Sequence, residues 1–245
     1  MGIKYVDMIG WDDCPHLCEP YVSKEQRDAM EARLLPHQRE ARKRGKPSLG
    51  AGAIYPIPEE DIIIQPFAIP DFWPRAYALD VGWNRTAALW AAMDPEPEKP
   101  VFYLYHEYYR AEALPVVHAA SIKSVGSWIT GALDPAARGR NQKDGTKLIE
   151  EYRKEDLNLV IANNAVESGL HKCLKLFQED RIKVFSTLNN FFTEYRLYRR
   201  DEKGKIVKKM DHLMDDLRYL LNTPNIFKTQ QIKEAHDRAT AKGEW

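Results

Sequence analysis

Three strand-like segments in close succession constrain the fold of this 245-residue chain more than any other feature. They cover residues 75–83, 86–93 and 101–109, and the last of them, VFYLYHEYY, is built almost entirely of aliphatic and aromatic residues. Strands joined by such short connections pair antiparallel. The sequence therefore predicts a three-stranded antiparallel meander.

Helical and strand-like stretches alternate after the meander. The expected helices cover residues 115–125, 146–154, 169–179 and 211–221, and the expected strands cover residues 128–133, 157–162 and 182–186. This alternation is typical of parallel strands connected by helices that cover the faces of a sheet. We expect an α/β fold in which the meander and the parallel strands form one mixed sheet.

The first 52 residues have a different character. Ser23 and Gln26 stand at the spacing of a capping box and predict a helix to about residue 35, and a short basic helix is expected at 37–43. A strand is expected at 61–67. We interpret residues 1–52 as a connector or the tail of a domain absent from this chain, and residues 53–245 as one domain.

Composition excludes several classes of protein. The chain has 36 basic and 36 acidic residues, so any surface for nucleic acid must be local. Its three cysteines are too few for a disulfide framework, and the spacing of Cys14, His16 and Cys18 is too loose to predict zinc. No signal peptide or run of 18 apolar residues is present, which favours the cytoplasm and no membrane.

Two isolated carboxylates stand in or directly after apolar strands. Asp80 interrupts the apolar strand AYALDVGW, where burial is costly unless the charge is paired or bound to a metal. Asp134 follows the strand 128–133, and the carboxyl ends of strands are where α/β sheets bind ligands. The alternatives are a solvent-facing strand side for Asp80 and ordinary turn chemistry before Pro135 for Asp134.

A third group of acids lies on the last expected helix, in the segment MDHLMDDLRY. Asp211 and Asp215 are one turn apart, and a divalent cation would relieve their repulsion. Alternatively, Asp211 is the N-cap and Asp215 forms a surface ion pair with Arg218. His212 and Asp216 fall on another helix face and are expected to face solvent.

Three carboxylates from distant parts of the chain suit the hydrolysis of a phosphodiester by two metal ions. Hard oxygen ligands favour Mg²⁺ or Mn²⁺, held roughly 3.5–4 Å apart. One ion would lower the pKa of the attacking water and the other would stabilise the leaving 3′-oxygen.

A basic segment precedes the last helix. Residues 195–209, YRLYRRDEKGKIVKK, predict a β-hairpin that turns at Asp201–Glu202–Lys203–Gly204. Its seven basic residues are Arg196, Arg199, Arg200, Lys203, Lys205, Lys208 and Lys209. We expect them to hold DNA phosphates beside the acids, the alternative being a solvated hairpin.

Several of these segments together resemble a known family. WDDCPHL, ALDVGW, LDPAARGRNQKDG, IANNAVESG and YRRDEKGKIVKKMDHLMDDLRYL, in this order, resemble the C-terminal nuclease part of the large terminase subunit of tailed bacteriophages. The resemblance covers nearly the whole chain and implies an RNase H-like fold. It matches the family's three acids to Asp80, Asp134 and Asp211, with Asp215 as a second candidate for the third.

The resemblance also implies a function. It indicates a metal-dependent endonuclease that cuts concatemeric double-stranded viral DNA during packaging in the host cytoplasm. The implied partners are the small terminase subunit, the portal protein and an N-terminal ATPase domain, whose P-loop signature G-x-x-x-x-G-K-[ST] is absent from this sequence. The alternatives are a non-catalytic module that grips DNA or docks on the procapsid, and another RNase H-like enzyme such as a junction resolvase or transposase.

Overall fold

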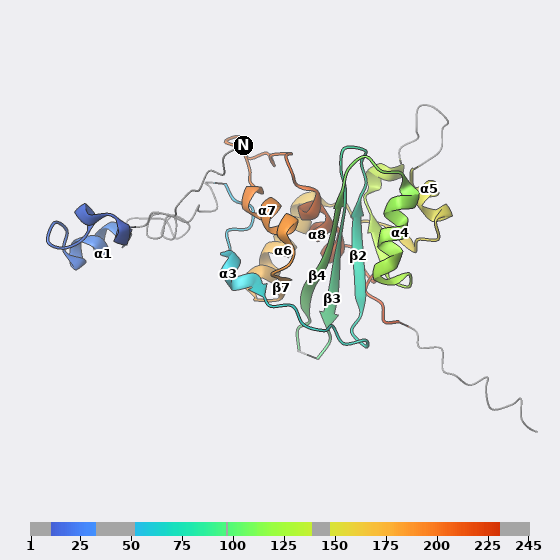
Figure 1. Ribbon diagram of the computed structural model, residues 1–245, viewed down its shortest axis with the longest axis horizontal. Coiled ribbons are helices and arrows are strands. Elements are labelled where there is room, and N and C mark those ends of the chain that lie inside the picture. The colour runs from blue at the N-terminus through green and yellow to red at the C-terminus, as the bar shows by residue number, and fades with distance from the viewer. Residues whose placement is uncertain (1–10, 33–51, 97, 139–147, 231–245) are drawn as a thin grey trace, which may run out of the picture.

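The computed structural model describes residues 11–32, 52–96, 98–138 and 148–230 (Figure 1). A seven-stranded sheet with the order β1-β7-β4-β3-β2-β5-β6 forms the centre of the molecule. The strands are β1 (Ile63–Ile64), β2 (Arg75–Asp80), β3 (Thr86–Asp94), β4 (Val101–Arg110), β5 (Thr130–Leu133), β6 (Leu159–Ile161) and β7 (Ile182–Phe185).

The predicted meander is confirmed. Strand β3 pairs antiparallel with both β2 and β4, and a register shift between Trp90 and Ala91 marks an irregularity in its pairing with β4. The remaining neighbours, β2–β5, β5–β6, β4–β7 and β1–β7, are parallel. The sheet is therefore mixed, as the sequence predicted, with the meander at its centre.

Helices cover both faces of the sheet. Figure 1 shows α4 (Pro115–Gly126) and α5 (Leu148–Lys154) on one side, and α6 (Val166–Gln178), α7 (Asn189–Leu197) and α8 (His212–Asn222) on the other. The shorter elements are α1 (Lys24–Ala32), α3 (Glu59–Ile62) and 3₁₀ helices at Trp11–Asp13, Pro15–Leu17 and Pro135–Arg138. No helix in the described ranges is long and apolar enough to cross a membrane.

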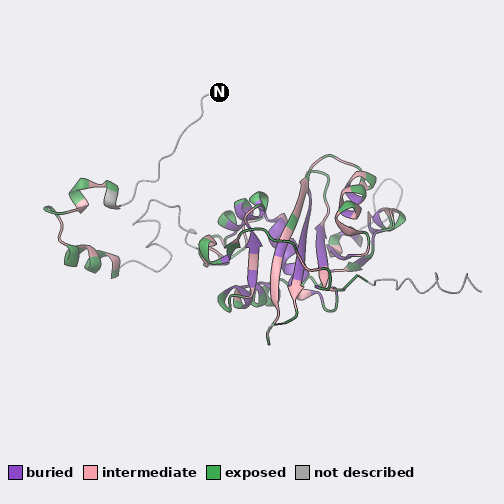
Figure 2. Cartoon of the chain, turned by 60° about the horizontal axis from the view of Figure 1, so that its bottom comes forward, coloured by how far each residue is buried: buried purple, intermediate pink, exposed green. Residues whose placement is uncertain are grey.

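Alternate residues of the central strands β2 and β3 belong to two different cores. In β2, Ala76 and Ala78 pack in the core that contains α6, α7 and α8, whereas Tyr77 and Leu79 pack in the core beneath α4 and α5. Figure 2 shows the resulting buried sheet with helices exposed on their outer surfaces. The same alternation places Asp80 on the α8 face of the sheet.

The first part of the domain is anchored to residues far along the chain. Ala53 pairs with Arg199, and Ile54 and Tyr55 are buried in the core on the α8 side. The capping box at the start of α1 is confirmed, since the Ser23 backbone N–H donates to Gln26 Oε1 at 2.9 Å and the Gln26 N–H donates to Ser23 Oγ at 3.3 Å.

Two expectations about secondary structure were wrong. The strand expected at 61–67 is only β1, because three acidic residues after Pro58 favour the single helical turn α3 and Pro66 cannot continue the pairing. Helix α7 was not predicted and includes the first residues of the expected hairpin. The helix expected at 37–43 lies outside the described residues, as do the first residues of the helix expected at 146–154.

Candidate active site

The two strand acids lie side by side at one edge of the sheet. Asp80 ends β2, and Asp134 directly follows β5, the parallel neighbour of β2. The Asp134 backbone N–H donates to the carbonyl oxygen of Leu79 at 3.0 Å, which fixes the two strand ends together. The structure therefore brings together two carboxylates that are 54 residues apart in the sequence (134 minus 80).

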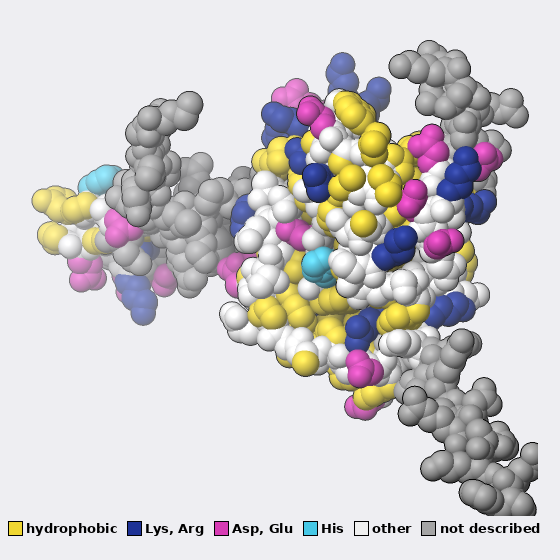
Figure 3. Space-filling model, turned by 45° about the vertical axis from the view of Figure 1, so that its right-hand side comes forward, with side chains coloured by type: hydrophobic (Ala, Val, Ile, Leu, Met, Phe, Trp, Pro, Cys, Tyr) yellow, Lys and Arg dark blue, Asp and Glu magenta, His cyan; other side chains and the backbone are white. Residues whose placement is uncertain are grey.

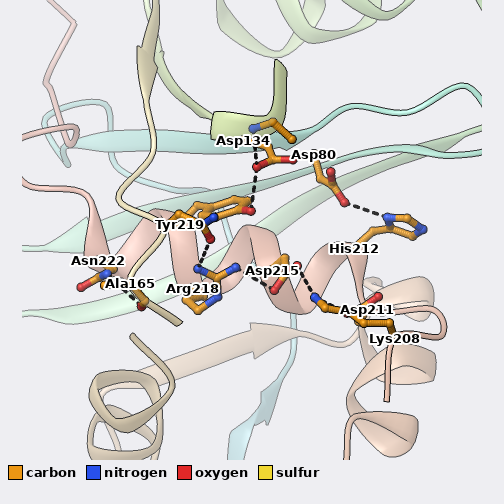
Figure 4. A network of polar contacts seen from close by, with 12 residues as sticks. Asp80, Asp134, Ala165, Lys208, Asp211, His212, Asp215, Arg218, Tyr219 and Asn222 are labelled. Carbon is orange, nitrogen blue, oxygen red and sulfur yellow. Dashed lines mark hydrogen bonds and ion pairs between the residues drawn. The ribbon is translucent and has the colours of Figure 1, made fainter. Parts of the chain in front are cut away.

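Helix α8 lies against this edge and contacts both acids (Figure 4). His212 Nδ1 is 2.7 Å from Asp80 Oδ2, and the Tyr219 hydroxyl donates to Asp134 Oδ1 at 3.0 Å. These two residues are seven apart, which places them on one face of the helix. One face of α8 thus holds both strand acids.

The charges at this face perturb each other. Burial raises the pKa of Asp80 while the hydrogen bond with His212 lowers it, and repulsion by Asp134 and Asp215 adds to the rise. The same hydrogen bond raises the pKa of His212, which favours the imidazolium form. Burial and the nearby Asp134 raise the pKa of Tyr219, so its hydroxyl stays protonated and donates.

The acids at the first turn of α8, Asp211 and Asp215, are neutralised by basic side chains. Lys208 Nζ lies 2.9 Å from Asp211 Oδ2 and 3.0 Å from Asp215 Oδ2, and Arg218 donates to Asp215 Oδ1 at 2.9 Å. The repulsion inferred from the one-turn spacing is therefore relieved by Lys208. Arg218 forms the expected pair with Asp215, but it is only 1% exposed, so the pair is not on the surface.

The start of α8 is capped from another helix. Asp211 occupies the N-cap position without a capping hydrogen bond from its side chain. Instead, the buried Glu194 of α7 accepts hydrogen bonds from the Leu213 backbone N–H and the Tyr109 hydroxyl, both at 2.6 Å. A carboxylate at this end of a helix is stabilised by the helix dipole and by the free N–H groups. Glu194 therefore fixes the end of α8 that carries His212.

Asp216 is the acid that sequence reasoning missed. It is fully buried, and among the described residues neither of its carboxylate oxygens has a hydrogen-bond partner. Burial, together with repulsion by Asp80 and Glu194 and by more distant acids, raises its pKa well above the ordinary value. The expectation that His212 and Asp216 face solvent was wrong, because α8 packs against the sheet on a second side as well as through its leucine stripe.

The oxygen-rich composition of the site fits a divalent cation. In the described part of the chain, no three His, Cys, Asp or Glu side chains are close enough together to hold a metal ion as they stand. Asp80 and Asp134 are instead held by His212 and Tyr219. Asp216 nevertheless has a buried carboxylate without a hydrogen-bond partner among the described residues. Together with Asp80 and Asp134 it forms an arrangement of acids that a hard cation would stabilise.

The basic segment is a short turn rather than an extended hairpin. Arg200 bridges to Ile206 across a turn in which Gly204 has a φ of 77°. Arg196 pairs with Glu59 and Arg200 with Glu167, each through two hydrogen bonds. With Lys208 held by the acids of α8, the remaining exposed cations of the seven are Arg199, Lys203, Lys205 and Lys209.

Acidic and basic side chains are interspersed on the face shown in Figure 3. This distribution agrees with the zero net charge of the chain. A DNA-binding surface on this protein would therefore be built from a few local cations and not from one broad basic face.

Comparison with known sequences identifies phage packaging proteins as relatives. No family model matches the chain. The chain is 36% identical over 226 residues to the terminase large subunit of Salmonella phage P22, which covers 88% of this chain and 43% of that protein. The large subunit of Enterobacteria phage LP7 is also 36% identical, with 46% of it covered. The chain thus spans less than half the length of these relatives.

Solved structures show the same fold. The P22 large terminase nuclease domain superposes with a TM-score of 0.67 at 34% identity, covering 74% of this chain and 97% of that one. The complete large terminase of another, thermophilic bacteriophage gives a TM-score of 0.59 at 19% identity, covering 83% of this chain and 53% of that one. The large terminase nuclease of the thermophilic phage G20c, whose magnesium-bound structure gives a TM-score of 0.50 at 13% identity, shares the fold over 69% of this chain and 96% of its own.

Proposed function

Because this chain belongs to the nuclease family of the phage terminase large subunit, we propose that it is a metal-dependent endonuclease that cuts concatemeric double-stranded viral DNA during genome packaging. Its fold is the RNase H-like mixed sheet of that family. The observation that carries the proposal is the meeting of Asp80 and Asp134 at adjacent strand ends, directly against the acids of α8.

The residues proposed to hold the metal are Asp80, Asp134 and Asp215. Asp215 is favoured over Asp211 because its charge acts on Asp80 at the end of β2 and on Asp216 and Tyr219 of α8. Lys208 contacts both acids, but the charge of Asp211 acts on His212 and Tyr109. Mg²⁺ or Mn²⁺ is the expected cofactor, in line with the carboxylate donors and with the magnesium in the G20c nuclease structure.

Two such ions would lower the pKa of the attacking water and stabilise the leaving 3′-oxygen. The protein's own contribution is to position the carboxylates. Tyr219 orients Asp134, Arg218 orients Asp215, and His212 holds Asp80 until a cation replaces it. Loss of partners that hold the ligands of a site in this way typically lowers metal affinity or activity by roughly 10–100-fold.

The proposed setting is the packaging machinery in the host cytoplasm. Double-stranded DNA is the substrate, and the family indicates the small terminase subunit, the portal protein and an ATPase domain as partners. The exposed cations of the Asp201–Gly204 turn lie directly before α8 in the sequence and are proposed to contact DNA phosphates beside the acids.

A plasmid assay tests this function. Supercoiled DNA is incubated with the chain in Mg²⁺, Mn²⁺ or EDTA, and with Asp80→Ala and Asp94→Ala variants. Asp94 ends β3 at the opposite edge of the sheet, so it is a matched control. We expect metal-dependent nicking that Asp80→Ala reduces by more than the roughly 10–100-fold typical of second-sphere changes. No cutting with either metal would favour a non-catalytic module that grips DNA or docks on the procapsid.

A further inference from the structure

The turn between β2 and β3 places two unusual side chains beside the acids. Residues 82–85, Gly-Trp-Asn-Arg, begin two positions after Asp80. Thr86 Oγ1 donates to the Gly82 carbonyl oxygen at 3.0 Å, and the Glu112 backbone N–H donates to the Trp83 carbonyl oxygen at 2.9 Å. The turn is therefore tied both to its own strand and to the connection that follows β4.

Gly82 is required for the tightness of this turn. A Cβ atom on Gly82 would lie 2.9 Å from the backbone oxygen of Arg85, closer than such contacts occur. The two ends of the turn thus approach each other directly, which projects the side chains between them outwards. The turn has a defined shape and stands next to the carboxyl end of β2.

Trp83 is exposed on this turn. Its side chain is 65% accessible, and Leu114 and Val116, shortly after the residue that bonds to the Trp83 carbonyl, are 60% and 48% accessible. Neighbouring exposed apolar side chains are typical of contact surfaces, and tryptophan is strongly enriched at binding surfaces. Next to the proposed nuclease site, the surface that can cover Trp83 is that of the sugars and bases of DNA.

Arg85 is a cation without an acidic partner in the described part of the chain, although several carboxylates lie nearby. Its guanidinium stacks over the ring of Tyr109, with Cζ 4.4 Å from the ring centre. Tyr109 is fixed by its hydrogen bond to Glu194, and its ring lies 6.3 Å from that of His212, the partner of Asp80. The charge of Arg85 is thus held next to Tyr109, whose other neighbour is the imidazole that contacts Asp80, and no ion pair neutralises it among the described residues.

We propose that the β2–β3 turn is a DNA-contacting element in which Arg85 binds a backbone phosphate next to the cleaved bond and Trp83 packs against the adjoining nucleotide. This inference rests on the proposed nuclease function, and it identifies the residues that position the DNA substrate. A guanidinium fork matches two phosphate oxygens, and stacking on Tyr109 aligns the fork in advance. Arg85 and Trp83 are positioning residues, since the acids perform the chemistry.

Binding is measured in the Asp80→Asn chain, in which loss of the proposed metal ligand is expected to prevent cutting. The anisotropy of a labelled 25-base-pair duplex is followed over a range of salt concentrations for Arg85→Gln, Arg85→Lys, Trp83→Ala and Lys154→Ala, each in this background. Lys154 ends α5, which returns towards the opposite edge of the sheet, and it is exposed, so it is the control. Thermal unfolding confirms that each variant is folded.

Arg85→Gln is expected to weaken binding about tenfold and to reduce the salt slope by about one phosphate contact. Arg85→Lys should keep the slope and lose part of the affinity. Trp83→Ala should weaken binding with the slope unchanged, and Trp83→Phe should remove most of the DNA-induced change in tryptophan fluorescence. Equal affinity and slope for Arg85→Gln and Lys154→Ala would overturn the inference.

The outcome is separable from that of the plasmid assay. Cutting by the unaltered chain, combined with Arg85→Gln binding like the Lys154 control, overturns the role of the turn and leaves the nuclease function in place. Binding that depends on Arg85, combined with no cutting in any metal, upholds the turn as a DNA contact and overturns the nuclease function.

Discussion

His212 Nδ1 lies 2.7 Å from Asp80 Oδ2, so the acid at the end of β2 is held by an imidazole from the last helix. The hydrogen bond favours the protonated imidazole, because the negative carboxylate stabilises its charge. A divalent cation would bind the same carboxylate. Protonated His212 and a metal ion at the proposed site would therefore compete for Asp80, and both the stability and the metal affinity of the site would depend on pH.

The first prediction concerns the stability of the metal-free chain. The raised pKa of His212 means that its ion pair with Asp80 stabilises the fold fully below about pH 6.5 and is lost as the pH rises through the folded-state pKa. His212→Gln should remove this pH-dependent loss of stability. The loss is at most ~1 kcal/mol, because the ion pair is partly exposed. Urea unfolding in EDTA at pH 6 and pH 8.5 measures it. His171→Gln, an exposed change on α6, serves as the control, and an unchanged pH dependence in His212→Gln would contradict the prediction.

The second prediction identifies the helix acid. Asp215→Asn is expected to lower metal-dependent cutting at least tenfold more than Asp211→Asn, because the charge of Asp215 acts on Asp80, whereas that of Asp211 acts on His212. Plasmid cutting in Mn²⁺ at matched protein concentrations compares the two variants, with unfolding temperatures as the check on folding. If Asp211→Asn lowered cutting more than Asp215→Asn, the third metal ligand would be Asp211, the residue first matched to the family.

The third prediction concerns Asp216. Because its pKa is raised in the folded state, folding binds a proton there, and stability falls as the pH rises from about 3.8 towards that folded-state pKa. Asp216→Asn carries no such charge and should be more stable than the original chain at pH 8 in EDTA, by about 1–2 kcal/mol.

The same variant tests the coupling to metal. Addition of Mn²⁺ should raise the unfolding temperature of the original chain more than that of Asp216→Asn, since binding relieves the repulsion among the acids. Equal metal-induced shifts in the two chains would show that Asp216 does not sense the cation.

The strand acids could be predicted from the sequence for a simple physical reason. Strand side chains alternate between the two faces of the sheet. Asp80 ends one apolar strand and Asp134 directly follows another, so both acids are expected at the carboxyl ends of the strands once the strands are recognised. No comparable rule applied to α8. Its residues 213–214 and 216–221 are all buried, so its leucine stripe identifies only one of the surfaces that it packs against.

The helix that sequence analysis did not predict begins through tertiary contacts. Glu107 of β4 accepts hydrogen bonds from the backbone N–H groups of Asn190 and Phe191, so α7 is capped by a residue more than 80 positions away. A local reading of the sequence contains no such signal. The stripe of His212, Asp216 and Tyr219 at i, i+4 and i+7 was visible in the sequence, but only the packed sheet shows which way it faces.

The fourth prediction uses the close contact between α6 and α8. A Cβ atom on Gly169 would lie 2.7 Å from Cγ of Arg218, the residue that holds Asp215. Gly169→Ala should therefore displace Arg218, destabilise the fold by about 1–3 kcal/mol and reduce metal-dependent cutting. Ser168→Ala, one position earlier on the exposed side of α6, is the matched control. Wild-type stability and cutting in Gly169→Ala would show that Arg218 has room to move without disturbing Asp215.

The fifth prediction separates paired from unpaired cations in the basic segment. Arg196 is engaged by Glu59, whereas within the described residues no ion pair is seen for Lys203 or Lys205 at the turn. The double change Lys203→Ala and Lys205→Ala should weaken binding to a DNA duplex and lower the salt slope by nearly two, at ~0.9 per phosphate contact. Arg196→Ala should leave the slope unchanged and cost less than ~1 kcal/mol of stability, since its ion pair is exposed.

The measurement is fluorescence anisotropy of a labelled duplex over a range of salt concentrations, in the Asp80→Asn background. If Arg196→Ala lowered the slope as much as the double variant, the exposed ion pair with Glu59 would have to open when DNA binds. The DNA-binding surface would then include the outer side of α7, and the turn would supply only part of it.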